Sequence, residues 1–311
     1  MIWVKGTDLR SEDAKVYEWN GEKFNGLTTI RDAVWGSPDV YMGVWVADEA
    51  KRLFALHEAG MEVEKRTLVY DPTEGRYCPA LEKWTASELF KDPEYLTKHG
   101  FRMRQRAADR GTVLHELMYA YSQNEVYSQD DIKYWVNDTV AASYVTDKPY
   151  RCDIEETTAY CESLNAWLRE TGFTPILAEV FAANRKFKYA TTIDVVGQFP
   201  GDGTIYHMDV KSRDDTTRSD AIQLAAQRYT EFIGVAGTWD ELPTETILNR
   251  KTARSGNILV TPERTRYRLL ANNQLHKYFR SFQRGIHEYK TLSMKGVYDR
   301  AITPKKERIA A

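Results

Sequence analysis

The stretch from Tyr189 to Tyr229 limits what the chain can fold into more than any other segment. Two short β-prone runs, at residues 191–197 and 204–211, flank a six-residue segment that contains a proline and two glycines. Apolar runs on both sides of such turn residues are typical of a β-hairpin. We therefore expect two antiparallel strands here.

The register of this hairpin would bring two carboxylates together. If the turn centres on the Gly-Asp pair in its middle, Asp194 lies opposite Asp209 across the ladder. Because side chains alternate along a strand, Lys211 projects to the same side as Asp209. The sequence therefore predicts that two aspartates and a lysine converge on one side of one sheet.

A metal ion would resolve the conflict between these carboxylates. Like charges placed opposite each other destabilise a sheet and raise one pKa unless a cation lies between them. Mg²⁺ prefers such oxygen ligands, and a lysine beside it can stabilise the charge that develops when a phosphodiester is attacked. An exposed hairpin with ordinary surface charges explains the same three residues, and Asp-x-Lys is frequent by chance.

A helix is expected after the second strand. Thr217 or Ser219 is suited to cap it, and apolar residues recur at helical spacing from residue 221 to residue 234. Gln223 and Gln227 are four residues apart and therefore share one flank, where two amides could contact a phosphate or a base edge.

A third strand is expected at residues 176–181, before the hairpin. If the chain turns near Arg185 and Lys186, Glu179 falls opposite Thr192 and on the same face as Asp194. Glu179 is then a secondary catalytic candidate that could ligate a second metal or orient a water. A slip of one residue would reverse its face.

The segment from Phe101 to Tyr121 has the pattern of an amphipathic helix that carries His115. Gly111 precedes the histidine by one turn, and a glycine inside a helix costs about 1 kcal/mol against alanine. We therefore expect a close approach to the helix at Gly111. A core histidine with a satisfied hydrogen bond is the alternative, and the arginines upstream, Arg110 among them, form either a phosphate contact or a solvated face.

Four short sequence motifs occur in a characteristic order along the chain. Arg-Gly-Thr-Val-Leu-His-Glu ends at Glu116, Ile-Asp ends at Asp194, Asp-Val-Lys-Ser begins at Asp209, and Gln-Leu-Ala-Ala begins at Gln223. This order resembles the RecB-type branch of the PD-(D/E)XK nuclease superfamily. The similarity spans about residues 110–229, with looser similarity at both ends to phage RecB-like exonucleases.

The resemblance implies an α/β fold with a restriction-endonuclease-like core, in which helices flank a central mixed sheet. It implies a Mg²⁺ or Mn²⁺ ion whose ligands are His115, Asp194, Asp209 and the backbone carbonyl of Val210. It also implies catalysis by Lys211 and substrate positioning by Gln223. Many such enzymes have a tyrosine four residues after this glutamine, where this chain has Gln227, with Tyr229 two residues further on. The candidate DNA contacts are Gln223, Gln227, Tyr229, Arg110 and Arg213.

The composition of the chain limits the class of protein, the cofactors and the location that can be expected. The chain has 311 residues, 42% of them hydrophobic, and a formal net charge of -2, which excludes a disordered chain and a generally cationic nucleic-acid coat. Three scattered cysteines cannot supply the four thiolates of the iron–sulfur cluster that some RecB-type nucleases carry, so no cluster is expected. Without an eighteen-residue apolar run or a signal-peptide pattern, we expect no membrane partner and a cytoplasmic location, that of the host if phage-encoded.

The remaining segments predict one domain. Residues 1–100 would be an N-terminal elaboration, with a hairpin around Asn20-Gly21, a helix at 40–60, and at 66–93 a mixed loop followed by a short helix from about Thr85. Residues 101–311 would form the nuclease core, with two helices at 131–144 and 154–170. A hairpin at 258–270, a helix at 273–292 and a basic tail would complete it.

The sequence therefore predicts a metal-dependent deoxyribonuclease, an exonuclease of phage or bacterial recombination, repair or replication. The alternatives are an endonuclease of the same superfamily and an inactive DNA-binding or assembly protein. DNA, as linear duplex or single strand, is the expected partner, and a single-strand annealing or recombination protein is a candidate second partner. Cleavage polarity, strand preference and oligomeric state are not assigned by the sequence.

Overall fold

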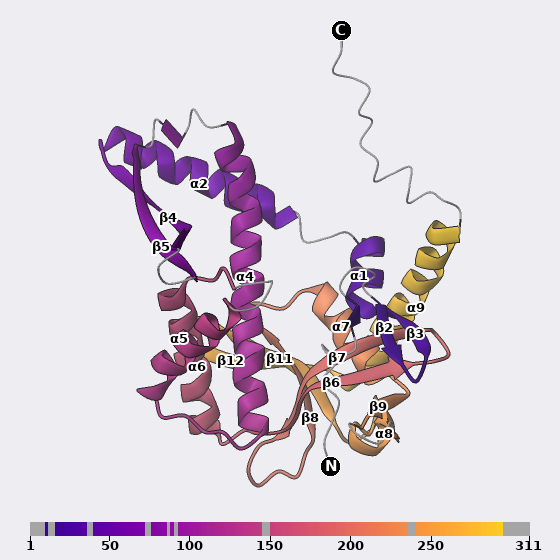
Figure 1. Ribbon diagram of the computed structural model, residues 1–311. Helices are drawn as coiled ribbons and strands as arrows, with labels where there is room; N and C mark the ends of the chain where they lie inside the picture. Colours follow the sequence, from indigo (N-terminus) through magenta and orange to yellow (C-terminus); the bar gives the residue numbers. More distant parts are fainter. Residues whose placement is uncertain are drawn as a thin grey trace.

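A mixed β-sheet forms the centre of the fold, and helices flank it (Figure 1). The computed structural model describes residues 10–11, 16–35, 40–71, 76–85, 88–89, 93–144, 150–235 and 240–294. The strands of the central sheet are β1 (Arg10–Ser11), β2 (Val16–Trp19), β3 (Glu22–Gly26), β6 (Thr174–Asn184), β7 (Tyr189–Gln198), β8 (Tyr206–Lys211), β9 (Phe232–Gly234), β10 (Glu241–Pro243), β11 (Arg254–Val260) and β12 (Thr265–Leu270). This confirms the expected α/β class with a mixed sheet.

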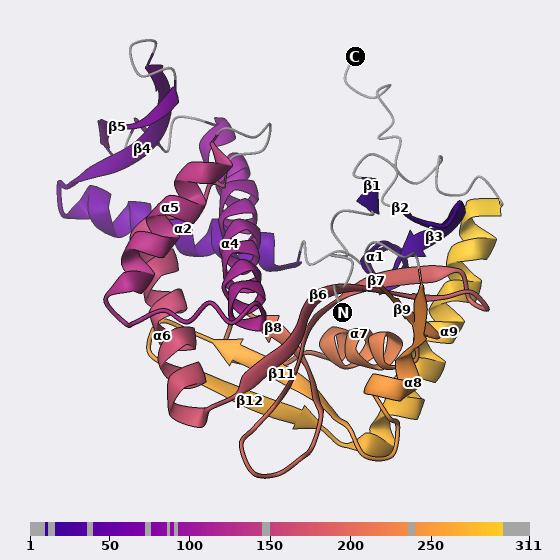
Figure 2. The same ribbon diagram turned by 60° about the horizontal axis from the view of Figure 1, so that its bottom comes forward.

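Helices pack on the sheet as two groups (Figure 2). The first group is α4 (Pro93–Ser122), α5 (Asp131–Ser143) and α6 (Ile154–Thr171), which share one core with β7, β8 and β11. The second is α1 (Leu27–Trp35), α7 (Arg218–Arg228) and α9 (Asn272–Met294), which share another core with Tyr189 of β7. The inward residues expected in the His115 helix, among them Leu114 and Leu117, are buried.

Strand β7 changes partner along one edge, and this positions the site. Its start, Tyr189 and Ala190, pairs in parallel with β3, while residues 195–197 pair antiparallel with β8. Val195 of β7 pairs with Met208 of β8, which is the register expected for the hairpin. Between those two partners, no strand in the described part of the chain pairs with the edge of β7 from residue 191 to residue 194, so the backbone polar groups of this edge need partners from side chains.

Helix α7 covers that open edge. Thr217 caps it as expected, in a capping box with Asp220. The helix ends at Arg228, however, whereas helical spacing predicted that it would continue to residue 234. Phe232 and Ile233 lie in β9 instead, because they pair with β6 and β10 and bury their side chains in the sheet.

The N-terminal third differs from the prediction in two ways. Residues 66–93 were expected to be a mixed loop, but β4 (Glu62–Asp71) and β5 (Arg76–Thr85) form a separate two-stranded ribbon. In the sequence, Pro79 argues against a strand, because proline lacks the N–H that pairs in a sheet. A two-stranded ribbon has open edges, where a strand can hold a proline without losing a hydrogen bond. The predicted boundary between residues 100 and 101 falls inside α4, and β3 joins the central sheet.

Two further helices complete the described chain, α2 (Val40–Glu58) and the short α8 (Thr244–Ile247). Among the residues that the structure describes, no helix is both long and apolar enough to cross a membrane.

Candidate metal centre

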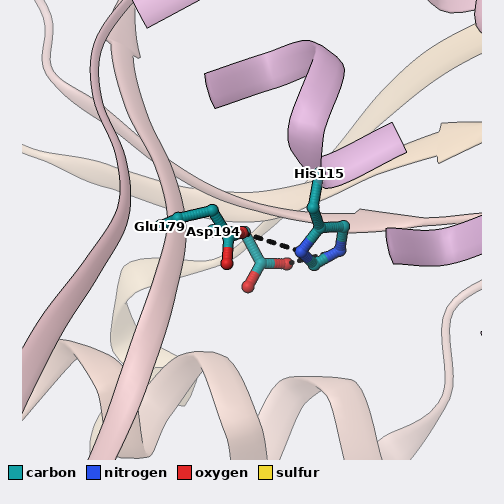
Figure 3. Close-up of side chains that lie close together, drawn as sticks. All are labelled: His115, Glu179 and Asp194. Carbon is teal, nitrogen blue, oxygen red and sulfur yellow. Dashed lines mark hydrogen bonds and ion pairs between the residues drawn. The ribbon is translucent and has the colours of Figure 1, made fainter. Parts of the chain in front are cut away.

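Three side chains from three elements meet at the open edge of β7 (Figure 3). His115 comes from α4, Glu179 from β6 and Asp194 from β7. The Nδ1 atom of His115 lies 2.8 Å from Oε1 of Glu179, and its Nε2 atom lies 3.5 Å from Oδ2 of Asp194. One ligand atom from each residue lies within 4.8 Å of the other two. We call these three residues the acidic-histidine cluster.

Glu179 enters the cluster through an unusual backbone conformation. Its φ angle is +52°, inside a strand whose neighbouring residues pair regularly with β7. The register places Thr192 opposite Phe181, so the expected pairing of Glu179 with Thr192 is wrong. The turn centres one residue later than predicted, and the resulting shift of two positions keeps Glu179 on the face of Asp194.

This conformation has a measurable cost. A residue with a Cβ atom in the left-handed region costs about 1–2 kcal/mol, whereas glycine adopts it freely. Without metal, Glu179→Gly should therefore unfold at a higher urea concentration than Glu179→Ala, with a difference of about 1 kcal/mol in the free energy of unfolding. Both variants lack the carboxylate, so they isolate the backbone. Equal stabilities would show that the left-handed conformation stores no strain.

Asp194 connects β7 to β8 where the ladder between these two strands ends. The ladder between β7 and β8 ends at the pair Val195 and Met208, before Asp194 would face Asp209. There the Asp194 carboxylate accepts a hydrogen bond from the backbone N–H of Val210, at 3.0 Å. The backbone N–H of Val210 is therefore connected to the cluster, and metal ligation by its carbonyl, which the resemblance implies, stays a prediction.

Asp209 is wholly buried and lies beside the cluster rather than in it. Its Oδ1 atom accepts a hydrogen bond from Nε2 of Gln223 at 2.7 Å, and its Oδ2 atom accepts one from Nδ2 of Asn257 at 2.9 Å. Burial and the charge of Asp194 raise the pKa of Asp209 to about 7 against the opposing effect of Lys211. A raised pKa is what two neighbouring carboxylates were expected to show.

The side chain of Lys211 contacts Asp209 beside the acidic-histidine cluster. Its Nζ atom lies 2.6 Å from Oδ2 of Asp209, and 20% of its side chain is exposed. Burial acts to lower its pKa, but the charges of Asp209 and Asp194 outweigh burial and raise the pKa above the ordinary value. Lys211 therefore keeps its positive charge at neutral pH while remaining open to a molecule that enters the site.

The charge of His115 depends on its two acidic neighbours. Burial opposes protonation, yet the carboxylates of Asp194 and Glu179 outweigh it and raise the pKa of His115 to about 10. Without metal, the imidazolium itself supplies the positive charge that the two carboxylates require.

Two residues at the site were not predicted from the sequence. Asn257 reaches Asp209 because β11 pairs with β8 in parallel, with Asn257 next to Asp209 in the register. Its position directly before the apolar residues 258–260 gave no signal of this contact. Arg31 of α1 donates from Nη1 to Oε1 of Gln223 at 2.9 Å, and nothing in the local sequence indicates this contact.

No protein-family model matches the chain, and no curated protein matches it. The proposal for its function must therefore come from the site itself.

All five candidate DNA contacts have partners within the protein, Gln223 among them. Gln227 is wholly buried, accepts a hydrogen bond through Oε1 from Nε2 of His207 at 3.1 Å, and donates from Nε2 to the carbonyl of Thr192 on the open edge of β7 at 2.9 Å. Tyr229 stacks on Phe279 with ring centroids 4.3 Å apart. The prediction that Gln227 faces DNA is wrong, because its side chain is wholly buried against the edge of β7. Tyr229 is only partly buried, and its contact with DNA stays a prediction.

The two candidate arginines are also engaged. Arg110 forms an ion pair with Glu156 and lies 4.2 Å above the ring of Tyr160. Arg213 forms an ion pair with Asp220 at the start of α7. Gln223 alone keeps the predicted place beside the catalytic candidates. The close approach expected at Gly111 is absent among the described residues, since a Cβ atom there would have no neighbour within 4 Å.

The donor set of the cluster fits a divalent ion. Two carboxylates and one imidazole are oxygen and nitrogen ligands that Mn²⁺ and Mg²⁺ accept. Ligand atoms that are each about 2.1 Å from one ion lie within about 4.2 Å of one another. The observed limit of 4.8 Å therefore calls for only small side-chain shifts.

Proposed function

We propose that the chain is a metal-dependent deoxyribonuclease with a restriction-endonuclease-like core. One observation carries the proposal: the acidic-histidine cluster lies directly beside a buried aspartate that is paired with a partly exposed lysine. The strained backbone of Glu179 supports it, because strain of this kind is concentrated at functional sites. The order of sequence motifs that resembles RecB-type nucleases agrees with this arrangement.

Each residue has a distinct role in the proposal. His115, Glu179 and Asp194 hold Mg²⁺ or Mn²⁺, which when bound polarises a phosphate oxygen and lowers the pKa of a water. The remaining two site residues act on the substrate and on each other. Lys211 stabilises the negative charge that accumulates on the phosphodiester during attack, and Asp209 fixes the position of its ammonium group.

Gln223 acts in support of this pair. Its amide donates to Asp209 while its carbonyl accepts from Arg31, so the amide is held in one orientation. Asn257 contacts the other oxygen of Asp209. With both oxygens engaged, Asp209 has little freedom to turn away from Lys211. In this proposal Asp209 orients the lysine.

The substrate class follows from the chemistry of the site and from the resemblance. A metal ion and a lysine side by side suit a phosphodiester, which accumulates charge on its oxygens as it is cut. The similarity to phage RecB-like exonucleases favours digestion from a DNA end.

The decisive experiment compares linear with closed circular DNA. End-labelled linear duplex, single strands and a covalently closed circle are incubated with Mg²⁺, with Mn²⁺ and with a chelator. We expect wild type to degrade linear DNA only with metal and to leave the circle intact, and Asp194→Asn to be inactive. Asp202→Asn is the matched control, because this exposed aspartate lies in the turn of the same hairpin, away from the cluster.

The outcomes separate the alternatives. Metal-dependent cutting of the circle would indicate an endonuclease. No cleavage of any of the DNA substrates, together with retained DNA binding, would replace the proposal by a DNA-binding protein without turnover. Equal cleavage by wild type and Asp194→Asn would exclude the acidic-histidine cluster as the site.

A further inference from the structure

Helix α9 has one buried face and one face open to solvent. Leu275, Phe279, Phe282 and Ile286 pack into the core shared with α1 and α7. Side chains on the remaining surface border a hollow along the helix, and they are Asn273, His276, Lys277, Arg280, Gln283, Arg284, His287 and Glu288.

Three cations form a row on this open face. Lys277, Arg280 and Arg284 are three and then four residues apart, a spacing that places them on one side of a helix. All three are exposed. Within the part of the chain that the structure describes, no ion pair joins any of them to a carboxylate. We call these three residues the α9 row.

A second row of arginines shows the contrast. Arg264 directly precedes β12, and Arg266 and Arg268 alternate along it, but each of the three forms an ion pair with Asp214 or Asp215. Their charge is therefore largely neutralised within the protein. The α9 row is left to attract a partner from outside.

The described length of α9 carries a local excess of positive charge. Residues 272–294 contain four lysines and arginines against one glutamate, whereas the whole chain has 43 lysines and arginines against 45 aspartates and glutamates. A basic segment on a chain that is slightly acidic overall indicates a local site for a polyanion rather than nonspecific binding over the whole surface.

We propose that the α9 row binds the phosphate backbone of duplex DNA at a place separate from the acidic-histidine cluster. This inference rests on the proposed function for the identity of the polyanion. α9 packs against α7 and α1, the helices that carry Gln223 and Arg31, so the row lies one helical layer from the site. It would hold the duplex beyond the point of cleavage.

The dimensions suit a backbone contact without base reading. At 1.5 Å per residue, Lys277 and Arg284 are about 10 Å apart along the helix axis, a length over which duplex DNA carries about six phosphates. Exposed lysine and arginine side chains that contact phosphates position a duplex but do not read its sequence. Binding through the row should therefore be independent of sequence and strongly dependent on salt.

The test measures DNA binding without turnover. A short fluorescein-labelled duplex is titrated with full-length protein in the presence of a chelator, and anisotropy is followed from about 50 to 200 mM salt. The variant Lys277→Gln/Arg280→Gln/Arg284→Gln removes three charges without adding acids. We expect its affinity at the lowest salt to fall more than about tenfold and its salt slope to fall by up to about three.

A second triple variant controls for net charge. Lys133→Gln/Arg151→Gln/Arg169→Gln removes the same charge from exposed positions in or near α5 and α6, in the other helical group. Thermal melts check that both variants fold, and Arg280→Gln alone, with a smaller loss expected, serves if the triple variant does not. The inference is overturned if the row variant binds as wild type or loses no more affinity than the control.

Failure of this inference differs from failure of the proposed function. A chain that degrades DNA while its row variant binds normally keeps the nuclease proposal and loses the DNA-binding row. A chain whose row variant loses binding, but which never cuts DNA, keeps the row and loses the nuclease proposal.

Discussion

Lys211→Met is expected to bind Mn²⁺ and DNA nearly as tightly as wild type and to cut DNA at least about a hundredfold more slowly. The Nζ atom of Lys211 lies 2.6 Å from Asp209, beside the acidic-histidine cluster, where the charge of the transition state would accumulate. DNA affinity, in contrast, is spread over many phosphate contacts, so one lost charge changes it little. Single-turnover cleavage and anisotropy titrations measure the two effects separately.

Methionine is chosen because it keeps the unbranched shape of the lysine in a mostly buried position. Removal of the ammonium leaves Asp209 without its cation, and Asp209 then keeps its proton instead of a buried charge. Lys188→Met is the matched control, since Lys188 precedes β7 and pairs with Glu22 at 2.9 Å on the surface. A merely structural Lys211 would lower the melting temperature and metal affinity together with the rate. Unchanged cleavage would remove Lys211 from the catalytic group.

The hairpin could be predicted from sequence because its information is local. The turn residues between β7 and β8 determine the register, and the pairing of Val195 with Met208 follows from them. The cap of α7 is local in the same sense, since Thr217 and Asp220 satisfy each other within one turn. Period and turn chemistry were sufficient for these features.

Residues brought in by distant pairing could not be predicted. Asn257 reaches Asp209 only because β11 adds in parallel to β8, 48 residues apart in sequence at that contact. Arg31 reaches Gln223 across 192 residues. Neither a parallel pairing nor the docking of a short helix leaves a periodic signal in one sequence.

Gln227 shows how a correct pattern can support a wrong inference. The spacing correctly placed Gln223 and Gln227 on one flank of α7, but it could not tell whether that flank faces solvent. The flank faces the open edge of β7, where the carbonyl of Thr192 needs a donor and Gln227 supplies it. Glu179 shows the converse, because the predicted face was correct although the predicted partner was not.

The affinity for Mn²⁺ is expected to rise about tenfold for each pH unit between about pH 7.5 and 9, measured by calorimetry under nitrogen. The pKa of His115 is raised to about 10 in the metal-free protein, so throughout this window the imidazole carries an extra proton. Metal binds only the neutral ring, and each Mn²⁺ must therefore displace one proton. The equilibrium shifts toward the bound state as the proton concentration falls.

This pH range also distinguishes the loss of a proton from His115 from the loss of a proton from Asp209. The pKa of Asp209 is raised only to about 7, so above pH 7.5 that carboxyl is largely ionised and adds little to the slope. His115→Gln should bind Mn²⁺ more weakly, with an affinity almost constant across the window, and excess Mn²⁺ should partly restore its activity. His57→Gln, at an exposed position on α2, should match wild type. A flat wild-type profile would mean that His115 does not exchange a proton for the metal, and a steep profile retained in His115→Gln would assign the displaced proton to another group.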